Sequence, residues 1–77
     1  MNAVRRKHLQ EAIDLIDRVK DILEDARDEE QECFDNLSEN LQCSERGKQF
    51  EDNADLLDDL MDDLDDVIYN IDDIIRQ

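Results

Sequence analysis

Proline is absent from this 77-residue sequence, and Gly47 is its one glycine. Proline and glycine are the residues that most often interrupt helices, so their near absence leaves few places where the chain must turn. The spacing of apolar residues lapses in the segment FDNLSENLQCSERG, which ends at Gly47. The sequence therefore predicts one turn, in the middle of the chain.

Long apolar runs are also missing. No run approaches the ~18–20 residues needed to span a bilayer, and the first residues, MNAVRR, lack the apolar core of a signal peptide. We therefore expect a cytoplasmic protein without membrane contact. In that reducing compartment Cys33 and Cys43 are expected to be free thiols.

Basic residues are scarce: nine lysines and arginines stand against 24 acids, for a net charge of −15. Phosphate binding needs bases that release counterions, so nucleic acid is excluded as a direct ligand. Basic protein surfaces are the expected partners. A chain of this length gains only ~3–5 kcal/mol from its own core, which also predicts a partner or a second copy.

Residues suited to catalysis or metal binding are few. His8, Cys33 and Cys43 have no zinc spacing, and no Glu-x-x-His pair suits a di-iron bundle. The segment DDLMD (58–62) has the DDxxD spacing of isoprenoid synthases, but 77 residues cannot enclose their cavity, so we attribute the match to chance. We expect no enzyme, no cofactor and no dedicated metal site; weak surface binding of divalent ions is an alternative role.

Apolar residues recur with alternating steps of three and four in both halves, as in helices that pack along a seam. In the first half the predicted seam is Leu9, Ala12, Ile16, Val19, Leu23, Ala26, Glu30, Cys33 and Leu37. In the second half it is Phe50, Ala54, Leu57, Met61, Leu64, Ile68, Ile71 and Ile75. The sequence thus predicts an all-α protein.

These two helices have similar lengths, which predicts an antiparallel two-helix hairpin forming a single domain over residues 1–77. The expected elements are a helix over about 3–34, a turn with a short helix over about 35–44, and a helix over about 45–76. Asn36 and Glu39 have the spacing of a capping box for the short helix, and Ser44 is a suitable N-cap for the second long helix.

The apolar stripe is wider than one hairpin needs. Further apolar rows are formed by Ile13, Leu15 and Ile22 in the first helix and by Leu60, Val67 and Ile74, with Leu56 beside them, in the second. Three rows suit a bundle, so we expect two hairpins to form a homodimeric four-helix bundle, or one hairpin to dock on another protein.

Aspartate dominates the second helix: between Gln49 and Ile75 there are eleven acids, ten of them aspartate, and no base. Aspartate is a weaker helix former than glutamate, but its shorter side chain makes a stiffer array of charges. The predicted partner-binding face is Asp52, Asp55, Asp59, Asp62, Asp63 and Asp66. A stiff row of carboxylates resembles a DNA backbone and suits a basic groove. Two other interpretations fit the same residues: a face that only keeps the protein soluble, and an adaptation to high salt.

The central run EEQECFDNLSENLQCSERG (29–47) resembles the centre of a family of small acidic helical-hairpin proteins of bacteriophages and mobile elements, with a DN-L/M-PESLQ-SERG-like pattern. Ser38 stands where that family usually has proline. The resemblance implies a protein of the bacterial host cytoplasm that binds a host enzyme, such as a defence nuclease, in some cases by imitating DNA. The turn residues that carry it are a second candidate surface or a packed corner: Asn36, Leu37, Leu41, Gln42, Ser44, Glu45, Arg46 and Gly47.

Overall fold

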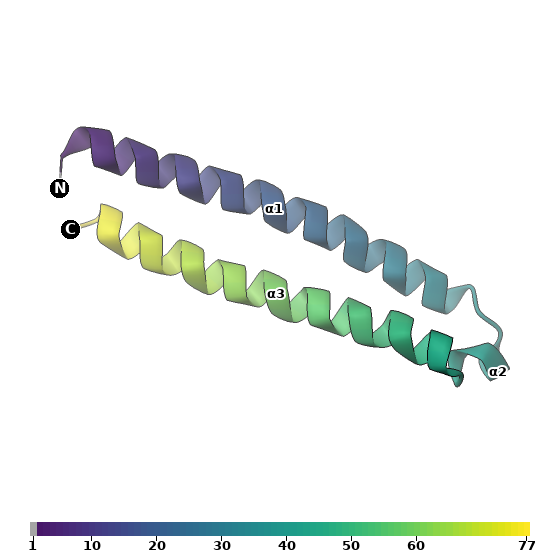
Figure 1. The fold of residues 1–77 in the computed structure, drawn as a ribbon. Coiled ribbons are helices and arrows are strands. Elements are labelled where there is room, and N and C mark those ends of the chain that lie inside the picture. The colour runs from purple at the N-terminus through teal and green to yellow at the C-terminus, as the bar shows by residue number, and fades with distance from the viewer. Residues whose placement is uncertain (1) are drawn as a thin grey trace.

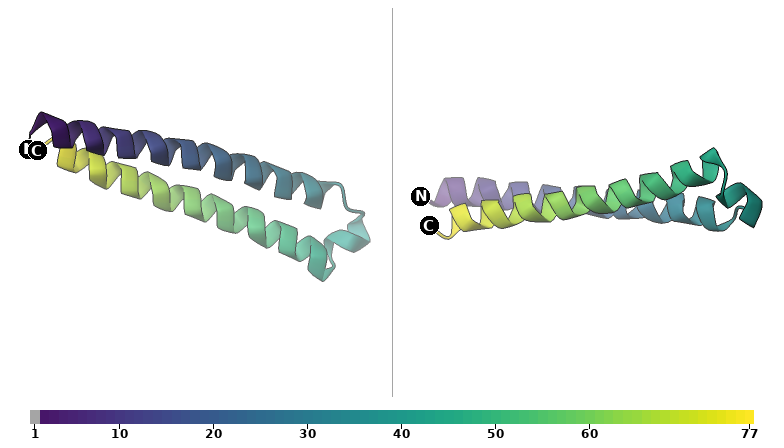
Figure 2. Two further views of the ribbon diagram at one scale, coloured as in Figure 1. Left: turned by 45° about the horizontal axis from the view of Figure 1, so that its top comes forward. Right: turned by 90° about the horizontal axis from the view of Figure 1, so that it is seen from below.

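The computed structural model describes residues 2–77, which form helices α1 (Ala3–Asp35), α2 (Glu39–Gln42) and α3 (Glu45–Ile75) and no strand. The predicted all-α class is confirmed. In Figure 1, α1 and α3 run in opposite directions, with both chain ends at one end of the molecule and α2 at the other. The hairpin measures 58 × 15 × 12 Å, and the two further views in Figure 2 show the same side-by-side arrangement.

The ends of the long helices are capped by side chains. Asn2 accepts a hydrogen bond from the amide of Arg5 (2.8 Å) at the start of α1. Ser44 accepts one from the amide of Gly47 (3.3 Å) at the start of α3, which confirms Ser44 as an N-cap. Such bonds satisfy amides that have no partner within the first turn.

The short helix differs from the expectation. Its N-cap is Ser38, whose backbone is extended and whose hydroxyl accepts a hydrogen bond from the amide of Leu41 (3.4 Å), so the prediction of Asn36 was wrong. Asn36 still has helical backbone angles, and its amide donates to the carbonyl of Glu32, so it ends α1 instead. Ser38 therefore sets where α2 begins.

The predicted seam of α3 is confirmed, because each of its eight members is buried or half-buried. Ala54 is 3% exposed and is the most deeply buried side chain of this helix. None of the helices described between residues 2 and 77 is long and apolar enough to cross a membrane.

The predicted seam of α1 was wrong at Val19 and Cys33, whereas its other members are half-buried. Val19 is 45% exposed and Cys33 is exposed, whereas Ile13 is 7% exposed. The seam runs instead through Leu9, Ile13, Ile16, Lys20, Leu23, Arg27, Glu30, Phe34 and Leu37. Two basic residues replace apolar ones because their long aliphatic stems cover the seam while their charged ends reach acids of α3.

The core of one hairpin is thin. Ile13 and Ala54 are the buried apolar side chains among the described residues, and no large side chain there is buried completely. Glu30 occupies a seam position, and its Oε2 is buried without a hydrogen-bond partner. Unlike Lys20 and Arg27, Glu30 therefore weakens the seam.

Candidate protein-binding surfaces

The outward side of α3 forms the acidic face, which we define as Asp52, Asp55, Asp59, Asp62, Asp63 and Asp66. All six side chains are exposed. The seam of α3 faces α1, and residues about half a turn away from a seam point to solvent. The row Asp52, Asp55, Asp59, Asp62 and Asp66 follows this outward line, with neighbours ~5–6 Å apart.

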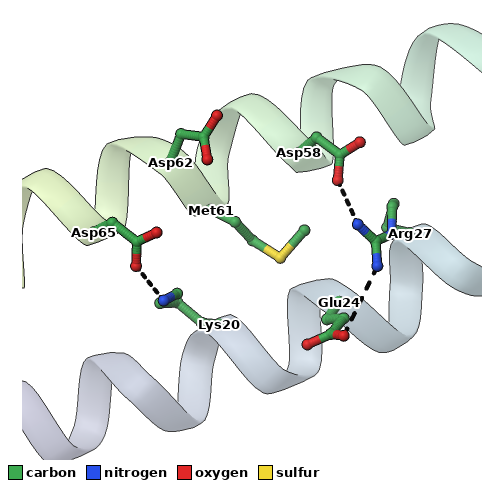
Figure 3. A pocket seen from close by; sticks show the side chains of 7 residues that line it. All are labelled: Lys20, Glu24, Arg27, Asp58, Met61, Asp62 and Asp65. Carbon is green, nitrogen blue, oxygen red and sulfur yellow. Dashed lines mark hydrogen bonds and ion pairs between the residues drawn. The ribbon is translucent and has the colours of Figure 1, made fainter.

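A second acidic row of α3 has a different position. This row consists of Glu51, Asp58, Asp65 and Asp72, and its members Asp58 and Asp65 turn toward α1. The guanidinium of Arg27 lies 2.6 Å from Asp58, and the ammonium of Lys20 pairs with Asp65 (Figure 3). Asp58 and Asp65 thus pair with bases of α1, and Asp72 pairs with Arg76 of its own chain end.

These ion pairs border an open groove between α1 and α3, with a volume of about 470 Å³. Figure 3 shows Met61 pointing from α3 toward α1 between the two pairs. The groove is lined by Lys20, Glu24, Arg27, Asp58, Met61, Asp62 and Asp65. Its bases, Lys20 and Arg27, are already paired with acids, so the groove joins the two helices and offers no free base to a ligand.

Each base of the groove binds its proton more tightly than usual. The hydrogen bond with Asp65 raises the pKa of Lys20 above its ordinary 10.5, and desolvation opposes this effect. Hydrogen bonds with Asp58 and Asp28 likewise raise the pKa of Arg27. A raised pKa in the folded state means that the pair stabilises the fold below the unfolded pKa and loses this effect as pH rises through the folded pKa.

Because the pKa of Lys20 is raised, the contribution of its ion pair can be tested at alkaline pH. Between about pH 9 and pH 12 the wild type is expected to lose more stability than the Lys20→Arg variant, whose guanidinium stays charged. Urea unfolding followed by circular dichroism at both pH values measures the difference. An identical loss in the two proteins would mean that the pair with Asp65 contributes nothing.

The flank opposite the groove carries an exposed apolar face. The ion pairs place Lys20 and Asp65 on one flank of the hairpin, so residues on the other side of each seam share the second flank. This apolar face consists of Leu15, Val19, Ile22, Leu56, Leu60, Val67 and Ile74, each at least 41% exposed. Monomers rarely leave such a continuous apolar surface in water.

The turn residues form a compact corner. Gly47 is buried, and the side-chain amide of Gln42 donates to the carbonyl of Phe34 (3.2 Å), which ties α2 to the end of α1. Arg46 lies over the ring of Phe50, 5.7 Å from its centre. Leu37 is half-buried and Leu41 is 53% exposed, so Leu41 remains accessible at the tip.

No group of three or more His, Cys, Asp or Glu side chains within residues 2–77 is arranged to hold a metal ion. The aspartates of α3 diverge around a continuous helix, whereas calcium needs ligands that converge. Both cysteines are unbridged and exposed.

Comparison with known proteins adds no relative: no family model, no curated protein and no solved structure matches the chain.

Sequence reasoning missed Lys20 and Arg27 as residues that join the helices. A signal was present, because they are seven residues apart and so are Asp58 and Asp65. Opposite charges with the same spacing on two antiparallel helices are brought together as matched pairs.

Proposed function

We propose that this protein is a non-catalytic binding protein whose acidic face occupies the basic, nucleic-acid-binding groove of another protein. The observation that carries the proposal is that all six aspartates of the face are exposed while the bases of the seam are paired with other acids. A partner therefore meets carboxylates that no lysine or arginine of this hairpin neutralises by an ion pair.

Charge density supports imitation of DNA. From Asp52 to Asp66 the six aspartates of the acidic face span 14 residue steps, which gives about one charge per 3.5–4 Å at about 1.5 Å per residue. One strand of DNA carries about one phosphate per 3.4 Å. The similarity suits a protein groove that normally holds a nucleic-acid backbone, with fast association that weakens as salt rises.

The proposal includes a setting. The central motif of the turn favours a bacteriophage or mobile element whose product inhibits a nucleic-acid-handling or defence enzyme in the bacterial cytoplasm. The chemistry of the face requires only that the partner be basic.

We also propose that two hairpins associate into a four-helix bundle. The thin core and the exposed apolar face support this, since burying the face against a second copy supplies apolar contact that one hairpin lacks.

A second candidate function is that of an adaptor that binds a foreign helix through the apolar face, with the aspartates acting only in solubility. The exposure of Leu60, Val67 and Ile74 favours it. The two functions differ in which surface determines binding.

Four substitutions of the acidic face, Asp59→Asn, Asp62→Asn, Asp63→Asn and Asp66→Asn, test the proposal. Partners captured from a bacterial lysate at low salt are to be assayed by displacement of labelled duplex DNA. The variant is expected to displace DNA roughly 10- to 100-fold less well, because it loses four exposed charge contacts. Its helicity is checked by circular dichroism.

The matched control removes four charges from α1 instead, by Asp14→Asn, Asp17→Asn, Asp21→Asn and Asp25→Asn, all at exposed positions. The proposal requires the control to bind nearly as well as wild type. Equal weakening of both variants would indicate bulk charge alone. Unchanged binding in both, with unchanged salt dependence, would favour the adaptor.

A further inference from the structure

The apolar face is almost free of acids, although the chain carries 24 of them. On α1 this flank is formed by two rows of residues spaced by seven, 5, 12, 19, 26, 33 and 8, 15, 22, 29, 36. On α3 it is formed by two further rows with the same spacing, 53, 60, 67, 74 and 49, 56, 63, 70, 77. Glu29 and Asp63 are their only acids. A basic partner would gain little from such a surface. A second copy of the chain, with its own charge of −15, can approach there without strong repulsion.

The outer row of α1 on this flank is self-complementary when it is reversed. His8, Leu15, Ile22 and Glu29 follow one another at intervals of seven. If a second α1 runs antiparallel across it, Leu15 meets Ile22 of the other copy and His8 meets Glu29. Val19, midway between Leu15 and Ile22, then lies near its own counterpart.

The ends of α1 favour the same direction. Arg5, Arg6 and Lys7 lie at the open end of the hairpin, and Glu29, Glu30 and Glu32 lie toward the turn. An antiparallel arrangement brings the bases of each copy beside the acids of the other. A parallel arrangement brings turn against turn, and therefore acids against acids, which is destabilising.

We propose that the apolar face binds a second copy of this chain in the antiparallel sense, α1 against α1 with Val19 near the two-fold axis. This inference rests on the self-association proposed above and adds its surface and direction. Interfaces with two-fold symmetry are self-complementary in this way. Arg5 and Glu29, about 36 Å apart along one α1, become neighbours across the interface.

Disulfide trapping tests the direction, because Cys33 belongs to the flank and is exposed. In the antiparallel dimer Cys33 of one copy lies opposite position 5 of the other. The two copies of Cys33 are then about 42 Å apart, at about 1.5 Å for each of 28 residues. In a parallel dimer the two copies of Cys33 are adjacent. Mild oxidation of the Cys43→Ser variant is therefore expected to give no linked dimer.

Addition of Arg5→Cys to Cys43→Ser is expected to give a linked dimer whose peptides join Cys33 to position 5. The matched control, Arg5→Cys with Cys33→Ser and Cys43→Ser, is expected to stay unlinked. Linkage through Cys33 alone, or no linkage in any variant that sediments as a dimer, would overturn the inference. A monomer in sedimentation at micromolar concentration would instead overturn the self-association on which it rests.

Exchange of the charges at positions 5 and 29 tests the direction of the dimer independently. Arg5→Glu and Glu29→Lys are each expected to raise the dimer dissociation constant about 3- to 10-fold, since a two-fold interface contains each contact twice. The double variant is expected to return to within about twofold of wild type. Additive weakening in the double variant would contradict the pairing of Arg5 with Glu29 across the interface.

Discussion

The Gly47→Ala variant is expected to lose about 3 kcal/mol of stability, because a methyl group at this position has no space. A Cβ built on Gly47 would lie 2.5 Å from the carbonyl oxygens of Leu41 and Gln42 and 2.7 Å from the Cα of Gln42. All three atoms belong to the backbone of α2, so rotation of a side chain cannot relieve the clash.

The expected change in stability is opposite to the one that replacement of glycine by alanine usually causes in a helix. Alanine normally stabilises a helix over glycine by about 1 kcal/mol, and Gly47 lies within α3 with a helical backbone. A fall in melting temperature of roughly 10–20 °C at fixed protein concentration is the predicted result. Gln49→Ala, at an exposed position of the same helix, serves as the control and is expected to change little. A more stable Gly47→Ala protein would show that α2 does not pack against α3 as described.

The Glu30→Leu variant is expected to gain stability. The buried Oε2 of Glu30 has no hydrogen-bond partner, and an unsatisfied buried group costs about 1–3 kcal/mol. Leucine removes this cost and adds apolar contact at a seam position that approaches Ala54 in the antiparallel register. We expect a gain of about 1–2 kcal/mol, or roughly 5–10 °C in melting temperature.

The control for this prediction is Glu32→Leu, two residues away on the exposed side of α1. It removes the same charge without filling the seam. If both variants gain equally, relief of charge repulsion explains the effect. If Glu30→Leu gains nothing, the carboxylate is solvated in solution.

The arrangement of α3 was predictable because each position of its seam is apolar. The seam of α1 was harder to predict, because apolar residues cover a wide part of the circumference of this helix. Two sets of seam positions are then possible, and they differ by one residue at every second position. Val19 and Cys33 are apolar, as seam residues are expected to be, whereas Lys20 and Arg27 are charged. The choice depends on Asp65 and Asp58 of the other helix, which a reading of α1 alone does not include.

The N-caps of the helices at the turn were also hard to assign from the sequence. Serine and asparagine are both good N-caps, so Asn36, Ser38 and Ser44 were all candidates by residue type. Only the path of the chain between the long helices decides among them. The acidic face was easier to place, because its six aspartates lie between confirmed seam positions of α3 and are exposed.

The pairs of Lys20 with Asp65 and of Arg27 with Asp58 repeat at a spacing of seven, and so does the acidic row to which those aspartates belong. If α3 slid by one heptad, Lys20 would meet Asp58 and Arg27 would meet Glu51, so ionic attraction alone tolerates the slip. The close fit of Gly47 beneath α2 fixes the length of the link and admits one of these registers. The smallest residue of the chain thereby sets the alignment of its two longest elements.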